Sequence, residues 1–293
     1  MFTKILKLST VFFVVGFLFF TNNPIFKIEN AFAGSCSSTG STAWATGSTW
    51  TAGCTGSGGI PAAGDNVTIL NTHNVTIATG VAAVATDITV NNGGTLTITS
   101  TGGLTASGNF VNNGTITGTG TLTLTGNGTT IDGTGAMTGL TGTFTLTNNK
   151  TINSTANLTV GSSTSAAAIS AATTITNNGS FAFGGTGAVT GGNATTTIWL
   201  QNSATAVLKI ASGTTTFLAT GVLTATTAGN TVNYNGTTQT CKLTNYSNLV
   251  MGGSGAKTCA LTTNTVYSIR VSNTAIWTLT AATVLTSGKT IYI

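Results

Sequence analysis

Apolar and polar residues alternate along most of this chain with a period of two. In residues 91–128, NNGGTLTITSTGGLTASGNFVNNGTITGTGTLTLTGNG, nearly every second residue is Thr, Ser, Asn or Gly, and Leu, Ile, Val or Phe often lies between them. This period predicts β-strands with one buried face. The apolar runs are short and end at Gly or Asn-Gly, which favour turns because both residues tolerate positive φ.

The same pattern predicts a series of short strands from residue 65 onward, with no helical spacing of apolar residues beyond the leader. The expected strands include 67–70, 75–78, 87–90, 96–98, 109–111, 115–117, 121–125, 143–147, 157–160, 173–176, 180–183, 196–200, 206–210 and 215–218. Phe144, Phe181, Phe183, Trp199, Phe217 and Trp277 fall in strand-like runs. We expect these aromatic side chains to stack in the core, with a ligand groove as the alternative.

A loose repeat runs through the strands. Paired asparagines recur with intervals of 21, 36 and 29 residues, at Asn91-Asn92, Asn112-Asn113, Asn148-Asn149 and Asn177-Asn178. These intervals fit one or two coils of roughly 18 to 21 residues. The sequence therefore predicts an all-β fold, a parallel β-helix or β-solenoid over residues 65–293.

The composition narrows the class further. Charged residues make up 4 % of the 293 residues, against about 25 % in an ordinary domain. Mean hydropathy is +0.34, yet past residue 33 no apolar run approaches the ~20 residues of a membrane-spanning helix. Beyond residue 33 there are six basic and three acidic residues, a net charge of +3 that is scattered along the chain. A chain without a basic patch is not expected to bind nucleic acid.

Residues 1–33 have the features of a signal peptide. Lys4 and Lys7 precede an apolar run over residues 11–20, and Ala31-Phe32-Ala33 is a small-x-small cleavage pattern. We expect cleavage after Ala33 and export to the cell surface or the extracellular space. The membrane is then met only through the transient signal peptide. An uncleaved membrane anchor is the alternative, although the apolar run is short for a span.

Residues 34–64 differ in texture and form a predicted N-terminal capping segment. They hold Trp44, Trp50 and Pro61. A solenoid needs a cap, because its first coil otherwise exposes apolar side chains and unpaired strand edges. We expect the two tryptophans to cover that end. The alternative is a stacking platform for glycans.

Four cysteines form two equally spaced pairs. Cys36 and Cys54 are 18 residues apart, as are Cys241 and Cys259. In an exported chain this arrangement predicts two disulfides, with free thiols as the alternative. Because 18 residues is about one coil, the second pair is expected on neighbouring coils, where a strand spacing of ~4.8 Å suits a disulfide.

The repeats resemble the β-helical repeats of bacterial surface proteins, such as adhesins and autotransporter passengers. The resemblance is carried by GDNVTI (64–69), NNGGTLTI (91–98), NNGTITGTGTLTLTG (112–126) and TNNGSFAFGGTG (176–187), and a second block at 231–258 is similar to another repeat of such proteins. It covers most of residues 60–293 and carries no catalytic signature. It implies a cell-surface or secreted protein whose partners are glycans or proteins at the cell surface.

The chain is poor in catalytic chemistry. A glycosidase needs two neighbouring carboxylates, and the part beyond the leader has only Asp65, Asp87 and Asp132. His73 is the single histidine, and no metal-ligand spacing, phosphate-binding loop or nucleophile motif occurs. We therefore expect a protein that is not an enzyme and has no cofactor or metal site.

Four functional hypotheses follow. The first is an exported structural or adhesin-like β-solenoid that serves as a stalk, a matrix component or a binding surface. The second is a self-assembling fibre subunit, since residues 289–293 are strand-like with no obvious cap; this end also fits the first part of a longer chain. A carbohydrate-active β-helix enzyme is the third. The fourth is an ice-binding threonine ladder over 95–101, 115–125 and 141–147, which irregular coil lengths disfavour.

Overall fold

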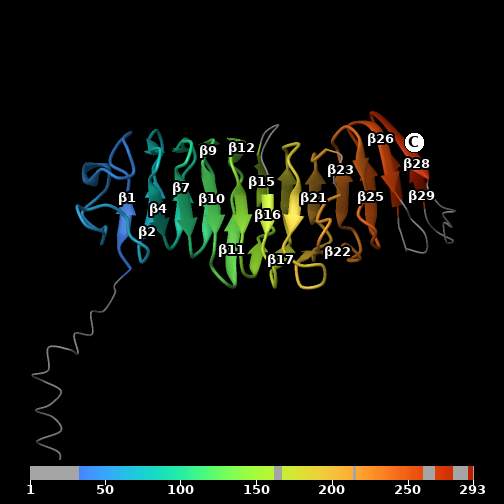
Figure 1. The fold of residues 1–293 in the computed structure, drawn as a ribbon, viewed down its shortest axis with the longest axis horizontal. Coiled ribbons are helices and arrows are strands. Elements are labelled where there is room, and N and C mark those ends of the chain that lie inside the picture. Colours follow the sequence, from blue (N-terminus) through green and yellow to red (C-terminus); the bar gives the residue numbers. More distant parts are fainter. Residues whose placement is uncertain (1–32, 162–166, 214–215, 260–267, 280–289, 293) are drawn as a thin grey trace, which may run out of the picture. The chain divides into compact units, whose positions relative to one another are not determined.

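The computed structural model describes residues 33–161, 167–213, 216–259, 268–279 and 290–292. Across them, short parallel strands stack coil upon coil (Figure 1). This is the predicted all-β parallel β-solenoid, and the prediction is confirmed. The 3-10 helix η1 (Gly47–Thr49) is the one helical element in this part of the chain. The expected leader lies outside the described residues, apart from Ala33.

Over residues 66–191, each coil contributes one strand to each of three sheets, and from residue 198 onward none of the described strands joins sheet 3. The chain passes from sheet 1 to sheet 2, then to sheet 3, and back to sheet 1, as from β2 through β3 and β4 to β5. Parallel strands of successive coils therefore lie side by side, with every connection serving as a corner. A fourth sheet begins after the last described strands of sheets 1 and 3.

The strand bounds, sheet by sheet, are as follows. Sheet 1 holds β1 (Ser35–Ser37), β2 (Asn66–Ile69), β5 (Ile88–Val90), β8 (Phe110–Asn112), β11 (Thr129–Asp132), β14 (Lys150–Ile152), β17 (Thr174–Asn177), β20 (Ile198–Gln201) and β22 (Val222–Thr224). Sheet 2 holds β3 (Asn74–Ile77), β6 (Thr95–Ile98), β9 (Thr115–Gly118), β12 (Ala136–Leu140), β15 (Asn157–Val160), β18 (Ser180–Phe183), β21 (Val207–Ile210), β23 (Thr231–Tyr234), β25 (Asn248–Met251), β27 (Ser268–Val271) and β29 (Thr290–Tyr292). Sheet 3 holds β4 (Ala82–Ala85), β7 (Gly103–Ala106), β10 (Thr121–Leu124), β13 (Phe144–Leu146), β16 (Ala167–Ile169) and β19 (Val189–Gly191), and sheet 4 holds β24 (Gln239–Thr240), β26 (Ser254–Cys259) and β28 (Thr274–Leu279).

The period of two places one face of most strands inside the solenoid. In β6 the residues Leu96 and Ile98 are buried, while Thr95 and Thr97 lie on the outer side. The strand register places aliphatic side chains above one another, since Leu96 pairs with Val75 in the preceding coil and with Ile116 in the next. Each buried aliphatic side chain contributes roughly 1.5–3 kcal/mol relative to exposure, so the column forms a continuous core.

Coil length varies more than the expected 18 to 21 residues. Val67 pairs with Ile88, 21 positions later, whereas Phe181 pairs with Leu208, 27 positions later. Near the other end Val232 pairs with Leu249, a step of 17. The additional residues lie in the corners, where a longer turn leaves the strand register unchanged.

Large aromatic side chains fill the middle of the core, as predicted. Phe181 and Trp199 have ring centroids 5.7 Å apart, and Trp199 and Phe217 have centroids 5.9 Å apart in an edge-to-face arrangement. Phe144 and Phe183 belong to the same buried cluster. The prediction of a core role is confirmed for these residues.

One expected strand is wrong. Thr215 lies outside the described residues, Thr216 belongs to no strand, and residues 217–218 form a turn. Leu218 has a φ of 46°, which a β-strand does not accommodate. Its apolar side chain is nevertheless fully buried. The apolar pattern therefore predicted burial correctly at this position, but the prediction of a strand was wrong.

Candidate functional site

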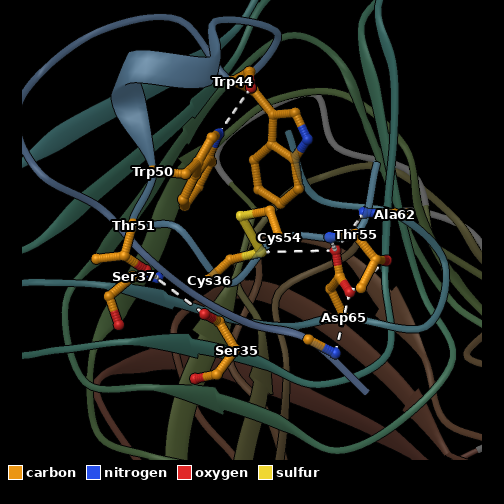
Figure 2. The surroundings of a disulfide bond; sticks show 11 residues. Ser35, Cys36, Ser37, Trp44, Trp50, Thr51, Cys54, Thr55, Ala62 and Asp65 are labelled. Carbon is orange, nitrogen blue, oxygen red and sulfur yellow. Dashed lines mark hydrogen bonds between the residues drawn. A yellow bond between two sulfur atoms is a disulfide. The ribbon is translucent and has the colours of Figure 1, made fainter. Parts of the chain in front are cut away.

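The N-terminal segment contains the most concentrated group of polar contacts around a buried charge. Asp65 is fully buried directly before β2, and its carboxylate faces backbone from three parts of the segment. Its Oδ1 accepts hydrogen bonds from the N–H of Gly34 at 3.1 Å and the hydroxyl of Thr55 at 2.7 Å. Its Oδ2 accepts from the N–H groups of Thr55 and Ala62, both at 2.8 Å (Figure 2). One carboxylate thus joins three stretches of chain that have no helix or sheet among them.

These bonds set the ionisation of the group. Burial alone raises the pKa of the Asp65 carboxyl, but the hydrogen bonds from Thr55, Ala62 and Gly34 outweigh it, and the pKa falls below its ordinary value. A carboxylate that accepts several N–H bonds is stabilised in its charged form. Asp65 is therefore an anion that organises the segment.

A disulfide lies against this carboxylate. The predicted pair Cys36 and Cys54 lies at disulfide distance, with Cα atoms 5.0 Å apart. The Cys36 Sγ is 3.6 Å from the Asp65 Oδ2 (Figure 2). Two sulfurs and one carboxylate within a few ångströms are a metal-like grouping. However, the sulfurs are bonded to each other and the carboxylate already accepts four hydrogen bonds, so this cluster does not fit a metal ion.

Trp44 and Trp50 lie next to the disulfide and are both buried. Their rings meet edge to face, with centroids 4.9 Å apart. The indole N–H of Trp50 donates to the carbonyl of Trp44 at 2.8 Å. Neither ring has a free face of the kind that stacks on a sugar.

The second predicted pair lies at the other end of the described chain. Cys241 and Cys259 have Cα atoms 4.8 Å apart. Sheet 4 places them on neighbouring coils, because Thr240 pairs with Thr258 in the residue row just before them. The prediction that this pair joins adjacent coils is confirmed.

The remaining candidates for catalysis do not come together. His73 Nδ1 lies 2.8 Å from the hydroxyl of Ser38, but that serine is buried and also accepts the N–H of Leu70. Asp87 Oδ1 accepts the N–H of Asn109 at 2.7 Å, which ties one coil to the next.

Asp132 also has a structural environment. Burial raises its pKa, but the side chain of Asn153, the N–H of Gly133 and the hydroxyl of Thr155 donate to the carboxylate, and the pKa is lowered overall. Asp132 lines a shallow depression of about 220 Å³. Its carboxylate is thus held as an anion by coil-to-coil hydrogen bonds.

Buried lysines are a feature that sequence reasoning missed. Lys257 is fully buried and donates to the carbonyls of Gly236 at 2.6 Å and Ser254 at 2.9 Å, and also to that of Thr237. Lys150 is similar, donating to the carbonyl of Thr147 at 2.9 Å and also to that of Gly126. These ammonium groups donate to backbone carbonyls at and beside the corners, which gives each buried cation the hydrogen-bond partners that it needs.

Buried amides were also missed, because asparagine was interpreted only as a turn residue. Asn177 and Gln201 both point inward, and the Asn177 Nδ2 donates to the Gln201 Oε1 at 2.6 Å. The same oxygen accepts from the indole of Trp199 at 3.1 Å. The signal available in the sequence was position, since both residues continue the inward-facing column of Ile152.

A groove of the described surface lies beside the last described strands of sheet 2. It has a volume of about 740 Å³, and Val250, Arg270 and Tyr292 line it together with the turn that leads into β28. Arg270 and Tyr292 are both exposed. This groove brings a cation and an aromatic ring together on one outer face.

No protein family model matches this chain, and comparison with curated proteins and with solved structures finds no match. No helix within the described residues is long and apolar enough to cross a bilayer.

Proposed function

We propose that this chain is an exported β-solenoid of the cell surface or the extracellular space, which acts as a rigid spacer and presents a binding surface in the manner of an adhesin. The observation that carries the proposal is the uninterrupted parallel ladder of sheet 2, in which eleven strands of the described chain pair in sequence order. A stack in which each coil contacts its neighbours is stiff along its axis and offers a long lateral surface.

The cysteines support an oxidising compartment. Both pairs lie at disulfide distance, and disulfides persist mainly outside the reducing cytosol. The leader pattern over residues 1–33 supports the same location. We place Trp44 and Trp50 in a cap over the first coil.

The side chains support a protein that is not an enzyme. Asp65 and Asp132 are each committed to several hydrogen bonds within the fold, and His73 is paired with a buried serine. None of these groups lines the groove formed by Val250, Arg270 and Tyr292. Binding, rather than bond breaking, is the function that this distribution favours.

Expression of the full chain in a bacterial host tests the proposal. We expect the protein outside the cytoplasm with an N-terminus at Gly34, and four cysteines that resist alkylation under denaturing, non-reducing conditions. Retention of Met1 together with four free thiols would reject export and the disulfides. The control is a Lys4→Glu/Lys7→Glu variant, which removes the basic start of the leader and is expected to stay inside the cell.

A fibre subunit is the second candidate, and exposed apolar side chains favour it. Ile276 and Ile291 are 64 % and 38 % exposed. They lie on β28 and β29, the last strands of sheets 4 and 2 among the described residues. Unpaired strand edges with apolar side chains are templates for another chain.

A further inference from the structure

We infer that the groove beside β25, β27 and β29 binds a carboxylated saccharide, held by Arg270 and Tyr292. This inference rests on the proposed function, because it assigns a ligand class to the surface of an extracellular binding protein. It is carried by the register of sheet 2, the volume of the groove and the distribution of charge along the chain.

The register places the two groups together. Arg270 pairs with Val250 on one side and with Tyr292 on the other, so the three residues occupy one row across adjacent strands. All three side chains lie on the outer face, because the alternate residues Leu249 and Ile269 are fully buried. Adjacent strands are ~4.8 Å apart, a spacing at which one ligand contacts both the guanidinium and the ring.

Among the described residues, no carboxylate lies near the guanidinium of Arg270 in the sequence or in sheet 2. Every acidic residue of the chain precedes position 133, at Glu29, Asp65, Asp87 and Asp132. Asp132 belongs to β11 in sheet 1, which is separated from β27 by many coils. An arginine presents a planar pair of donors that matches a carboxylate in two parallel hydrogen bonds. Arg270 is therefore available to an anion from outside.

The walls of the groove fit a sugar. Tyr292 is 56 % exposed and offers an aromatic face, while Val250 and Ala275 add small apolar surfaces. Ser272 and Asn273, at the turn into β28, also line the groove and supply hydroxyl and amide groups. Apolar walls with a few placed polar groups are typical of ligand sites, and about 740 Å³ is within the size range of such sites. A saccharide with a carboxylate matches this combination of ring, amide and cation.

The test is calorimetric titration of the exported protein with trigalacturonate and with its methyl ester, which has the same sugar skeleton without the charge. We expect the acid to bind at least tenfold more tightly than the ester. Arg270→Gln should weaken binding of the acid at least tenfold, and Tyr292→Ala should weaken it similarly, whereas Tyr292→Phe keeps the ring and should bind within about twofold.

The matched control is Lys209→Gln. Lys209 is an exposed cation in the same row of sheet 2, three strands before Arg270, or ~14 Å away, and it does not line the groove. Its loss should change binding less than twofold. Circular dichroism of each variant checks the fold.

Three results would overturn the inference: equal binding of acid and ester, an equal loss in Lys209→Gln and Arg270→Gln, or tighter binding of a single-stranded DNA oligomer than of trigalacturonate. An exported protein that binds no acidic sugar would refute this ligand class and leave the proposed function standing. A protein that stays in the cytoplasm would refute the proposed function itself.

Discussion

At the scale of single residues, the interior of this solenoid contains more polar side chains than the alternation of apolar and polar residues predicts. Lysines and carboxamides are buried, and backbone carbonyls and neighbouring side chains pair with them. A buried charge is costly unless it is hydrogen-bonded. Backbone carbonyls at and beside the corners of the coils provide those partners. Buried polar side chains therefore hold the backbone of the corners in place from the interior side.

Replacing Asp65 by Asn tests its role in the N-terminal segment. The amide keeps the shape of the carboxylate, but its NH₂ group must face either the N–H groups of Thr55 and Ala62 or the N–H of Gly34 and the hydroxyl of Thr55. We expect a loss of about 1–3 kcal/mol from unsatisfied buried donors. Hydrogen exchange over residues 34–64 measures it.

The effect of Asp65 also depends on pH in a defined direction. Its pKa is lower in the folded state than the ~3.9 of an unfolded aspartate. The stabilisation is therefore complete above about pH 4 and is lost as pH falls through the folded pKa. Asp87→Asn is the control, because Asp87 is partly exposed and accepts one N–H bond. Equal exchange rates in the two variants would contradict a special role for Asp65.

Lys150 gives a pH dependence of the opposite kind. Burial lowers the pKa of its ammonium group to about 8, whereas an unfolded lysine titrates near 10.4. Between these values the unfolded chain binds more protons, so stability rises with pH. Wild-type protein should gain stability relative to Lys150→Met from about pH 8 to pH 10 in urea unfolding. A difference between the two proteins that stays level or falls from about pH 8 to pH 10 would contradict the lowered pKa of Lys150.

At the scale of elements, close stacking of coils depends on particular glycines. Gly118 has a φ of 113°, and a Cβ there would lie 2.0 Å from the carbonyl oxygen of Ile98 in the preceding coil. Gly64 has open space around the same position. The two glycines thus differ in whether a methyl group can be accommodated.

We expect Gly118→Ala to cost about 2 kcal/mol or more, because overpacking and an unfavourable backbone conformation act together. Gly64→Ala should change stability by at most about 0.5 kcal/mol. Thermal unfolding followed by circular dichroism compares the two variants. Similar melting temperatures would contradict the prediction, because they would show that β6 and β9 can move apart to accommodate the methyl group without loss of stability.

The elements also show how far the sequence predicts this fold. Strands with Leu, Ile or Phe at alternate positions, such as β6 and β10, are evident from the period of two. Sheet 3 also uses β4 and β7, where Ala85 and Ala106 are buried in place of larger side chains, and this weak apolar signal hides those strands. Strand register depends on how distant parts of the chain pack. The pairing of Arg270 with Tyr292 could therefore not be predicted from the sequence, although both residues are evident in it.

At the scale of the whole molecule, charge is divided along the chain. Residues 34–149 contain three aspartates and no lysine or arginine, and residues 150–293 contain six basic residues and no acidic one. Two of the six, Lys150 and Lys257, are buried. The exposed cations of the later coils therefore lack acidic neighbours in sequence, which makes these coils the part of the molecule that attracts anions.

The N-terminal segment pairs with the first strands of the coils, which bears on whether the protein is a spacer or a fibre subunit. Strand β1 pairs with β2 in sheet 1. In sheet 2 the backbone of Thr76 in β3 bonds to Thr42 at 3.0 Å and to Trp44 at 2.8 Å. The first coil strands of sheets 1 and 2 are thus partnered, while β4 is the edge strand of sheet 3 among the described residues. Partnered edges do not recruit another chain, so two of the three edges at this end are protected.

We therefore expect the exported protein to remain monomeric, with a sedimentation coefficient that does not change between about 1 and 100 μM at physiological salt, where surface charges beyond ~8 Å are screened. Negative-stain electron microscopy should show separate particles. Filaments that lengthen with protein concentration would favour the fibre subunit instead. In that case Ile276→Lys and Ile291→Lys should abolish them, because a charge on an edge strand opposes strand addition, and Leu243→Lys is the matched control at an exposed leucine outside both edge strands.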